Sequence, residues 1–155
     1  MNGLVIAGGQ SSRMGADKAL INYHGKPQFQ YVYGMLLEYC DKVYISAKED
    51  RYNLPTILDD KKYENSGPIA GLLSAFDFSE TDWLILAVDY PLISGEDIQQ
   101  LINSNHSLGS ALYNSKTDFY EPFLGLYRKP FGEVLTSNFQ QGNTSMQKIL
   151  KRINA

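Results

Sequence analysis

The residues with the clearest chemical potential lie in the stretch LVIAGGQSSRMGADKALI, residues 4–21. Gly8 and Gly9 follow an apolar run, and Arg13 and Lys18 come shortly after them. Glycines let the backbone approach a ligand closely, and successive N–H groups in such a turn can form an anion-binding concavity. The two basic residues add a planar guanidinium and a mobile ammonium charge. The stretch predicts a phosphate-binding loop; the alternative is a glycine turn with two solvated basic side chains.

This loop differs from the two best-known phosphate-binding signatures. No Gly-Lys-Ser/Thr closes it, as a P-loop requires, and its glycines are not spaced as in the dinucleotide-binding fingerprint. If the loop binds a nucleotide, it belongs to another class of nucleotide-binding protein.

A carboxylate follows a second apolar run, WLILAV at 83–88, where Asp89 opens the sequence DYPLI. Mg²⁺ prefers carboxylate and phosphate oxygens, so an acid at a strand end is a candidate metal ligand. The alternative is a turn aspartate ahead of Pro91. A phosphate-binding loop and a metal ligand at one sheet edge are what phosphoryl or nucleotidyl transfer requires. Asp59 and Asp60, after PTIL, are weaker candidates, because paired acids in a loop are usually solvated.

The elements that position these residues alternate between strands and helices. Short aliphatic runs predict strands at 3–7, 42–47, 55–58, 83–88, 110–113 and 123–127. Helical spacing predicts helices after Pro27, over 67–76, after Ser94 with Asp97, and after a capping box of Thr144 and Gln147. Continuous apolar strands separated by helices predict a mainly parallel sheet covered on both faces. Ligands of such sheets bind beyond the carboxyl ends of the strands.

The composition is that of an ordinary globular protein. The 155 residues predict one domain, with 43% hydrophobic and 20% charged residues. A net charge of -3 without long charged runs gives no sign of a nucleic-acid or membrane partner. Cys40 is the only cysteine, which excludes an intramolecular disulfide and a cysteine-based zinc site. With no signal-peptide pattern at its start, the chain is expected to be cytoplasmic.

The stretch LVIAGGQSSRMGADKALINYHGKP resembles the opening signature of nucleotidyltransferases with a Rossmann-like fold. Its RMGADKAL portion is most similar to the molybdenum cofactor guanylyltransferases, the MobA family. The resemblance continues, in the family's order, through GPIAGLLSAF, LAVDYPLI, YEPFLGLY and NTSMQKIL. It implies an α/β fold over residues 1–155: a Rossmann-like three-layer sandwich whose mainly parallel central sheet is flanked by helices.

The resemblance also implies the residues of the site. The loop segment that surrounds the guanine nucleotide matches Ile6, Ala7, Gly8 and Gly9. Lys18 matches a nucleotide contact and, with Arg13, would stabilise the departing pyrophosphate. Ser46 stands where relatives often carry an asparagine. Asp60 matches a nucleotide-contacting acid by its spacing to Gly67-Pro68, and Asp59 is the register alternative. Asp89 matches the Mg²⁺ ligand.

The activity implied is transfer of GMP from GTP to molybdopterin carrying molybdenum, with release of pyrophosphate. Three alternatives remain open: cytidylyl transfer to the same cofactor, guanylyl transfer to a cobamide precursor, and a nucleotide-binding module without turnover. Molybdoenzyme maturation proteins are a further class of expected partner. Family members usually continue into a segment with an Asn-Thr-Pro motif, whereas this sequence ends at LKRINA. Glu121 is a candidate on the pterin side.

Overall fold

The computed structural model describes residues 1–7 and 18–155. Their strands form one mixed sheet in the order β3-β2-β1-β4-β6-β5. The strands are β1 (Asn2–Ile6), β2 (Lys42–Ala47), β3 (Thr56–Leu58), β4 (Trp83–Ala87), β5 (Gly109–Asn114) and β6 (Phe119–Tyr127). The neighbours from β3 to β4 pair in parallel, and β6 runs antiparallel to both β4 and β5. The predicted mainly parallel sheet is confirmed.

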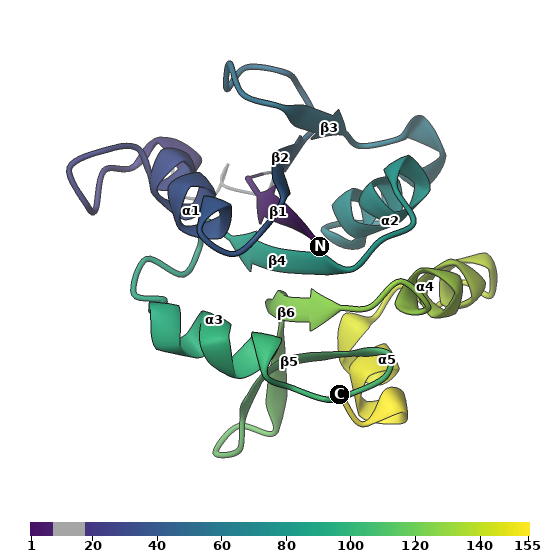
Figure 1. Cartoon of the computed structure of the whole chain (residues 1–155). Coiled ribbons are helices and arrows are strands. Elements are labelled where there is room, and N and C mark those ends of the chain that lie inside the picture. Colours follow the sequence, from purple (N-terminus) through teal and green to yellow (C-terminus); the bar gives the residue numbers. More distant parts are fainter. Residues whose placement is uncertain (8–17) are drawn as a thin grey trace.

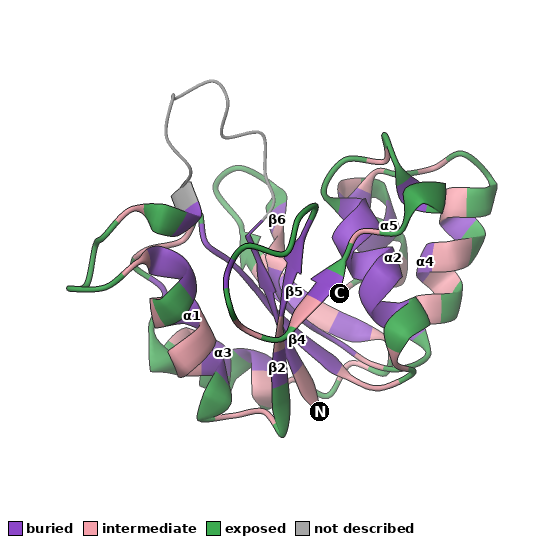
Figure 2. Ribbon diagram, turned by 90° about the horizontal axis from the view of Figure 1, so that it is seen from above, coloured by how far each residue is buried: buried purple, intermediate pink, exposed green. Residues whose placement is uncertain are grey.

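Helices cover both faces of this sheet, as Figures 1 and 2 show. One face carries α1 (Gln28–Leu37) and α3 (Gly95–Ile102), and the other carries α2 (Ile69–Phe78), α4 (Phe131–Gln140) and α5 (Met146–Ile153). Two short 3-10 helices, η2 (Lys18–Leu20) and η3 (Lys61–Tyr63), lie in the connections after β1 and β3. The three-layer sandwich expected from the sequence is therefore present.

Strand β4 shows why the sequence folds in this way. Side chains of a strand point alternately to the two faces of its sheet. Trp83 and Ile85 pack into the core under α2, α4 and α5, whereas Leu84 and Leu86 pack into the core under α1 and α3. All four side chains are fully buried, so an uninterrupted apolar run is what a central strand with two covered faces requires.

The predicted helix start at Ser94 is confirmed, and Ser94 with Asp97 forms a capping box there. Ser94 Oγ accepts a hydrogen bond from the backbone N–H of Asp97 (3.2 Å), and Asp97 Oδ2 accepts one from the N–H of Ser94 (2.9 Å). These reciprocal bonds satisfy two backbone donors at the helix start.

The predicted capping box of α5, Thr144 with Gln147, is wrong. Ser145 caps the helix by accepting a hydrogen bond from the N–H of Lys148 (3.4 Å). The Gln147 side chain instead pairs with the backbone of Tyr120 on β6, as donor to its carbonyl (2.6 Å) and acceptor from its N–H (3.1 Å). The Gln147 amide therefore makes tertiary hydrogen bonds to β6 and not the local capping bond.

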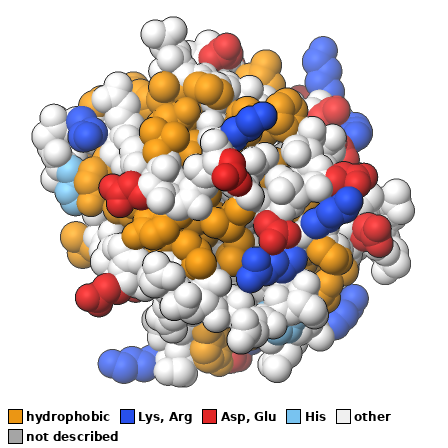
Figure 3. Space-filling model, viewed as in Figure 1, with side chains coloured by type: hydrophobic (Ala, Val, Ile, Leu, Met, Phe, Trp, Pro, Cys, Tyr) orange, Lys and Arg blue, Asp and Glu red, His pale blue; other side chains and the backbone are white. Residues whose placement is uncertain are grey.

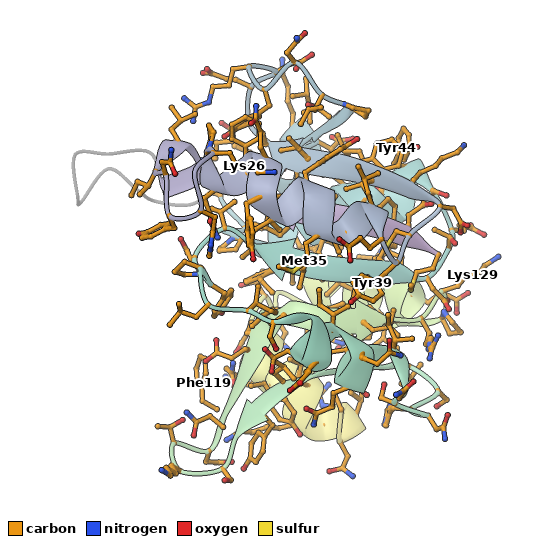
Figure 4. The ribbon with its side chains drawn as sticks, turned by 60° about the vertical axis from the view of Figure 1, so that its left-hand side comes forward. Lys26, Met35, Tyr39, Tyr44, Phe119 and Lys129 are labelled. Carbon is orange, nitrogen blue, oxygen red and sulfur yellow. The ribbon has the colours of Figure 1, made fainter. Side chains whose placement is uncertain are left out.

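The helix α4 was not predicted, and β6 begins earlier than predicted. Pro130 precedes α4 and provides no side-chain cap, so no capping residue marked its start. The first residues of β6 pair with β5, including Tyr120 with Tyr113, which extends the strand back to Phe119. Figure 4 shows Phe119, the first residue of β6, and Lys129, two residues beyond its end, on opposite sides of the molecule.

Charged side chains of the two signs are mixed on one face of the molecule. Among the described residues on the face seen in Figure 3, Lys and Arg alternate with Asp and Glu without forming a patch of one sign. In the described part of the chain, no helix is long and apolar enough to cross a membrane.

Candidate active site

The candidate site lies at the edge where the four parallel strands end. Three backbone hydrogen bonds continue the sheet ladders just past the strand ends: Ala7 N–H to Ser46 O (3.2 Å), Val88 N–H to Ile6 O (3.2 Å) and Asp59 N–H to Ala47 O (3.1 Å). Because β6 is antiparallel to β4, the start of β6 reaches the same edge. Residues that follow β1, β3 and β4 are thereby brought together, as the fold class predicts.

On the β2 side of this edge, Ser46 and Asp59 form a hydrogen-bonded pair. Ser46 is almost fully buried, with 3% of its surface exposed. Its Oγ donates a hydrogen bond to Asp59 Oδ1 (3.3 Å). Gly71 of α2 faces the pair: a Cβ added there would lie 2.2 Å from Ser46 Oγ and 3.5 Å from Asp59 Oδ1. The absence of a side chain at Gly71 therefore makes room for the pair.

Asp60, the acid selected by sequence spacing, is turned away from this pair. Its Oδ1 accepts a hydrogen bond from the N–H of Lys62 (2.9 Å) and caps η3, and its Oδ2 lies 3.9 Å from Lys62 Nζ. Its own N–H donates to Ser74 Oγ of α2 (2.9 Å). The exposed carboxylate of Asp60 has a local structural role, and Asp59 is the acid that faces Ser46.

Burial dominates the electrostatics of Asp59. Desolvation raises the pKa of its half-buried carboxyl, while the Ser46 hydroxyl and the positive charge of Lys48 act in the opposite direction. A half-buried acid with a raised pKa at the ligand-binding edge of a sheet is a candidate functional group.

Asp89 is exposed at the same edge, two residues after the end of β4. A carboxylate oxygen is a suitable donor for a hard divalent cation. Among the described residues, no group of three or more His, Cys, Asp or Glu side chains is arranged to hold a metal. A cation at Asp89 could take its further ligands from phosphate and water oxygens. That donor set fits Mg²⁺, which retains waters and binds through one or two carboxylates and substrate phosphates.

Sequence reasoning missed the role of Tyr90, which follows Asp89. Tyr90 Oη donates a 2.6 Å hydrogen bond to Glu121 Oε2 on β6, and both residues are partly buried. Burial, together with the neighbouring Glu121 carboxylate, raises the pKa of Tyr90 well above its ordinary value. The phenol therefore stays protonated and holds the carboxylate in place. No local sequence pattern marks a pair this far apart in the chain.

A second contact fixes the loop after β4. His24 Nε2 lies 2.7 Å from the carbonyl oxygen of Pro91, and its ring stacks on Tyr31 of α1 at a centroid distance of 3.7 Å. His24 is exposed, and it joins the segment before α1 to the loop that carries Asp89.

The remaining predicted residues divide into two groups. Ile6 and Ala7 are buried, at 6% exposure each, where β1 reaches the edge. Gly8, Gly9 and Arg13 lie outside the described residues, and only the backbone of Lys18 is described, at the start of η2. Their roles remain predictions from the sequence.

The mainly parallel sheet with helices on both faces defines a Rossmann-like α/β protein. The family model described as the MobA-like NTP transferase domain matches residues 3–155. The chain therefore belongs to this family of nucleotidyltransferases.

Named relatives agree with this assignment. The chain is 40% identical over 134 residues to a molybdenum cofactor biosynthesis bifunctional protein of Synechocystis, covering 81% of this chain and 38% of that protein. It is 29% identical to a molybdenum cofactor guanylyltransferase of Pseudomonas entomophila, covering 95% of this chain and 80% of the relative. The structure of molybdopterin-guanine dinucleotide biosynthesis protein A from Archaeoglobus fulgidus shares the fold, with a TM-score of 0.74 and 21% identity over 98% of this chain and 80% of that chain.

Proposed function

We propose that this protein is a guanylyltransferase that transfers GMP from GTP to the molybdenum cofactor. The observation that carries the proposal is the convergence of Ala7, Asp59 and Asp89 at one sheet edge in a chain of the MobA-like family. Curated relatives that match most of the chain are named molybdenum cofactor guanylyltransferases, which supports this choice of substrates. The expected partners are thus GTP and molybdopterin, and the expected compartment is the cytoplasm.

The nucleotide would lie over the β1, β2 and β3 half of the sheet. Backbone groups at Ile6 and Ala7 lead into the glycine-rich residues that the sequence assigns to the phosphates. The carboxylate of Asp59, which accepts a hydrogen bond from Ser46, would accept another from the nucleoside. We assign this contact to Asp59 rather than to Asp60, because the Asp60 carboxylate caps η3.

The reaction needs alignment and charge neutralisation more than proton transfer. A terminal phosphate oxygen of molybdopterin attacks the α-phosphorus of GTP. The bond from that phosphorus to the bridging oxygen breaks, and the electron pair leaves with pyrophosphate. No general base is required, because the attacking phosphate is already an anion. Lys18 and Arg13 are the basic residues that the sequence assigns to neutralising the leaving group.

Asp89 would hold the divalent cation. Bound there, Mg²⁺ would lower the repulsion between the two phosphates by neutralising charge on their oxygens. The contribution of the chain is to place the carboxylate, and two features do so. The Val88–Ile6 hydrogen bond ends the ladder just before Asp89, and the His24–Pro91 contact holds the loop that follows.

Ligand-dependent thermal unfolding tests the nucleotide assignment. A ligand that binds only the folded state stabilises it by about 2.7 kcal/mol at a hundredfold excess over Kd. GTP should raise the Tm more than CTP, ATP or UTP at equal concentration, and Mg²⁺ should increase the shift. A preference for CTP would replace guanylyl with cytidylyl transfer. The absence of a shift with every nucleotide would contradict the proposed function.

A further inference from the structure

The geometry of the site limits where the acceptor can bind. The residues assigned to the nucleotide lie on β1, β2 and β3, and Asp89 follows β4, so the free half of the edge belongs to β6 and β5. The attacking and leaving oxygens of a phosphoryl transfer lie roughly in line, on opposite sides of the phosphorus. With the nucleoside and the pyrophosphate assigned to residues that follow β1, β2 and β3, the β6 and β5 half of the edge is the space left for the acceptor. This step rests on the proposed function.

Glu121 is the acid at this half of the edge. The pairs of β4 and β6 run from Trp83–Tyr127 to Leu86–Leu124, and the same antiparallel register continued past its last pair sets Glu121 level with Asp89. The 2.6 Å hydrogen bond from Tyr90 to Glu121 is consistent with that position.

An irregularity in the sheet occurs at the same residue. Along β5 the pairing advances from Ala111 to Leu112, while along β6 it moves from Gly125 to Glu121. Such bulges are common beside active sites, where they redirect a side chain out of the regular ladder. The irregularity therefore releases the segment just after Glu121 from regular pairing with β5.

The carboxylate has the wrong charge to bind a phosphate. Its Oε2 accepts from Tyr90 and has a second lone pair, and its Oε1 makes no hydrogen bond within the described residues. It therefore suits a part of the acceptor that carries N–H donors rather than phosphate. A pterin ring has such a part in its 2-amino-4-oxo-pyrimidine edge, where two N–H groups point the same way and match the two oxygens of a carboxylate.

We infer that Glu121, held in place by Tyr90, recognises the aminopyrimidinone edge of the pterin and determines which acceptor the enzyme uses. Tyr90 is a positioning residue in this arrangement, since it acts through Glu121. The guanine base carries a similar donor edge, but the nucleotide contacts assigned here lie on the other side of β4. Loss of Glu121 should therefore weaken binding of the pterin and leave binding of GTP unchanged.

The test is a comparison of steady-state constants for Glu121→Gln, Tyr90→Phe and a control. Asp77→Asn is the matched control, because Asp77 also accepts a 2.6 Å hydrogen bond from a tyrosine, Tyr63, but lies on α2 outside the proposed site. With Mo-molybdopterin as the varied substrate, E121Q should raise KM about 10- to 100-fold, the range for hydrogen bonds to a charged group. Y90F should raise it less, and D77N should leave it unchanged. The KM for GTP, and the rise in Tm caused by GTP with Mg²⁺, should change less than about twofold in all three, well below that range.

Two results would overturn the inference alone. One is an unchanged KM for Mo-molybdopterin in E121Q while the unsubstituted protein transfers GMP normally. The other is a weakened GTP or Mg²⁺ dependence of the Tm in E121Q, which would assign Glu121 to the metal and nucleotide. Absence of GMP transfer by the unsubstituted protein would overturn the proposed function and the inference together.

Discussion

Ser46 and Asp59, 13 residues apart in the sequence, are joined by a 3.3 Å hydrogen bond at the edge where β2 and β3 end. On this relationship we base the proposal that Asp59, of the two adjacent acids, faces the nucleotide site. The resemblance, through the spacing to Gly67-Pro68, favours Asp60 instead.

Substitution of each acid by its amide should affect nucleotide binding unequally. Asp59→Asn should raise the KM for GTP about tenfold or more, because a charged hydrogen-bond acceptor is lost. Asp60→Asn is the matched control and should leave KM within about twofold and the fold intact, since asparagine caps a helix about as well as aspartate. A KM effect in D60N without one in D59N would restore the register given by sequence spacing.

The stability gained in D59N should depend on pH. Burial raises the pKa of Asp59 in the folded protein, so folding favours the protonated carboxyl. That favourable contribution is present below the pKa of the unfolded chain and is lost as pH rises through the folded pKa. D59N, which cannot ionise, should therefore be more stable than the unsubstituted protein at neutral pH. The difference should vanish below about pH 4, near the ordinary aspartate pKa. Urea unfolding across this range measures it; a gain that persists at acid pH would contradict the assignment.

Gly71→Ala should disturb the pair from the α2 side. The new Cβ would meet Ser46 Oγ at 2.2 Å, so the hydroxyl must rotate or the helix must shift. Overpacking of this kind costs about 1–3 kcal/mol, offset by up to about 1 kcal/mol from replacing glycine within a helix. Ser46→Ala removes the clashing oxygen, so the double variant should be more stable than the two single effects predict. Additive effects in chemical denaturation would show that the close approach is relieved elsewhere.

Gln28 should be replaceable with a gain in stability. Its side chain is fully buried at the start of α1, and neither carboxamide atom has a hydrogen-bond partner within the described residues. Gln28→Met keeps the length of the side chain and removes the unsatisfied polar atoms, which should stabilise the protein by about 1–3 kcal/mol.

Asn138 provides the contrast for Gln28. It is also buried, but its amide donates to Val134 O (2.8 Å) and accepts from Asn143 Nδ2 (2.8 Å). Asn138→Leu should therefore destabilise, because it leaves Asn143 without its partner. Destabilisation by Q28M, measured in the same denaturation series, would indicate that the Gln28 carboxamide is satisfied in solution.

The sequence predicts the sheet well because each strand is marked by its own apolar run. WLILAV and KVYISA indicate strands whatever lies beside them, and the carboxyl-edge rule then places Asp89 without further information. Long-range pairing has no such local signal. Tyr90 and Glu121 are 31 residues apart, and no sequence pattern near either residue predicts their contact. Gln147 satisfied a local capping pattern, yet its amide pairs with Tyr120 on β6.

The same reason explains the choice between Asp59 and Asp60. Adjacent residues leave a strand in opposite directions, so the direction in which each points depends on the residue at which β3 ends. The sequence does not define that residue to within one position. In the structure, the hydrogen bond from Asp59 N–H to Ala47 O marks where the pairing of β3 ends. The carboxylate of Asp60, the next residue, caps η3.

The most direct test of the central claim follows the α-phosphate of GTP. GTP radiolabelled at that phosphate is incubated with Mo-molybdopterin and Mg²⁺, and transfer of label to the pterin is measured for the unsubstituted protein and for Asp89→Asn. We expect transfer by the former and a loss of at least about 100-fold in the latter, equivalent to about 3 kcal/mol of transition-state stabilisation. The unfolding midpoint of D89N, measured in parallel, establishes that the variant is folded. No transfer by the unsubstituted protein, or full transfer by D89N, would contradict the account.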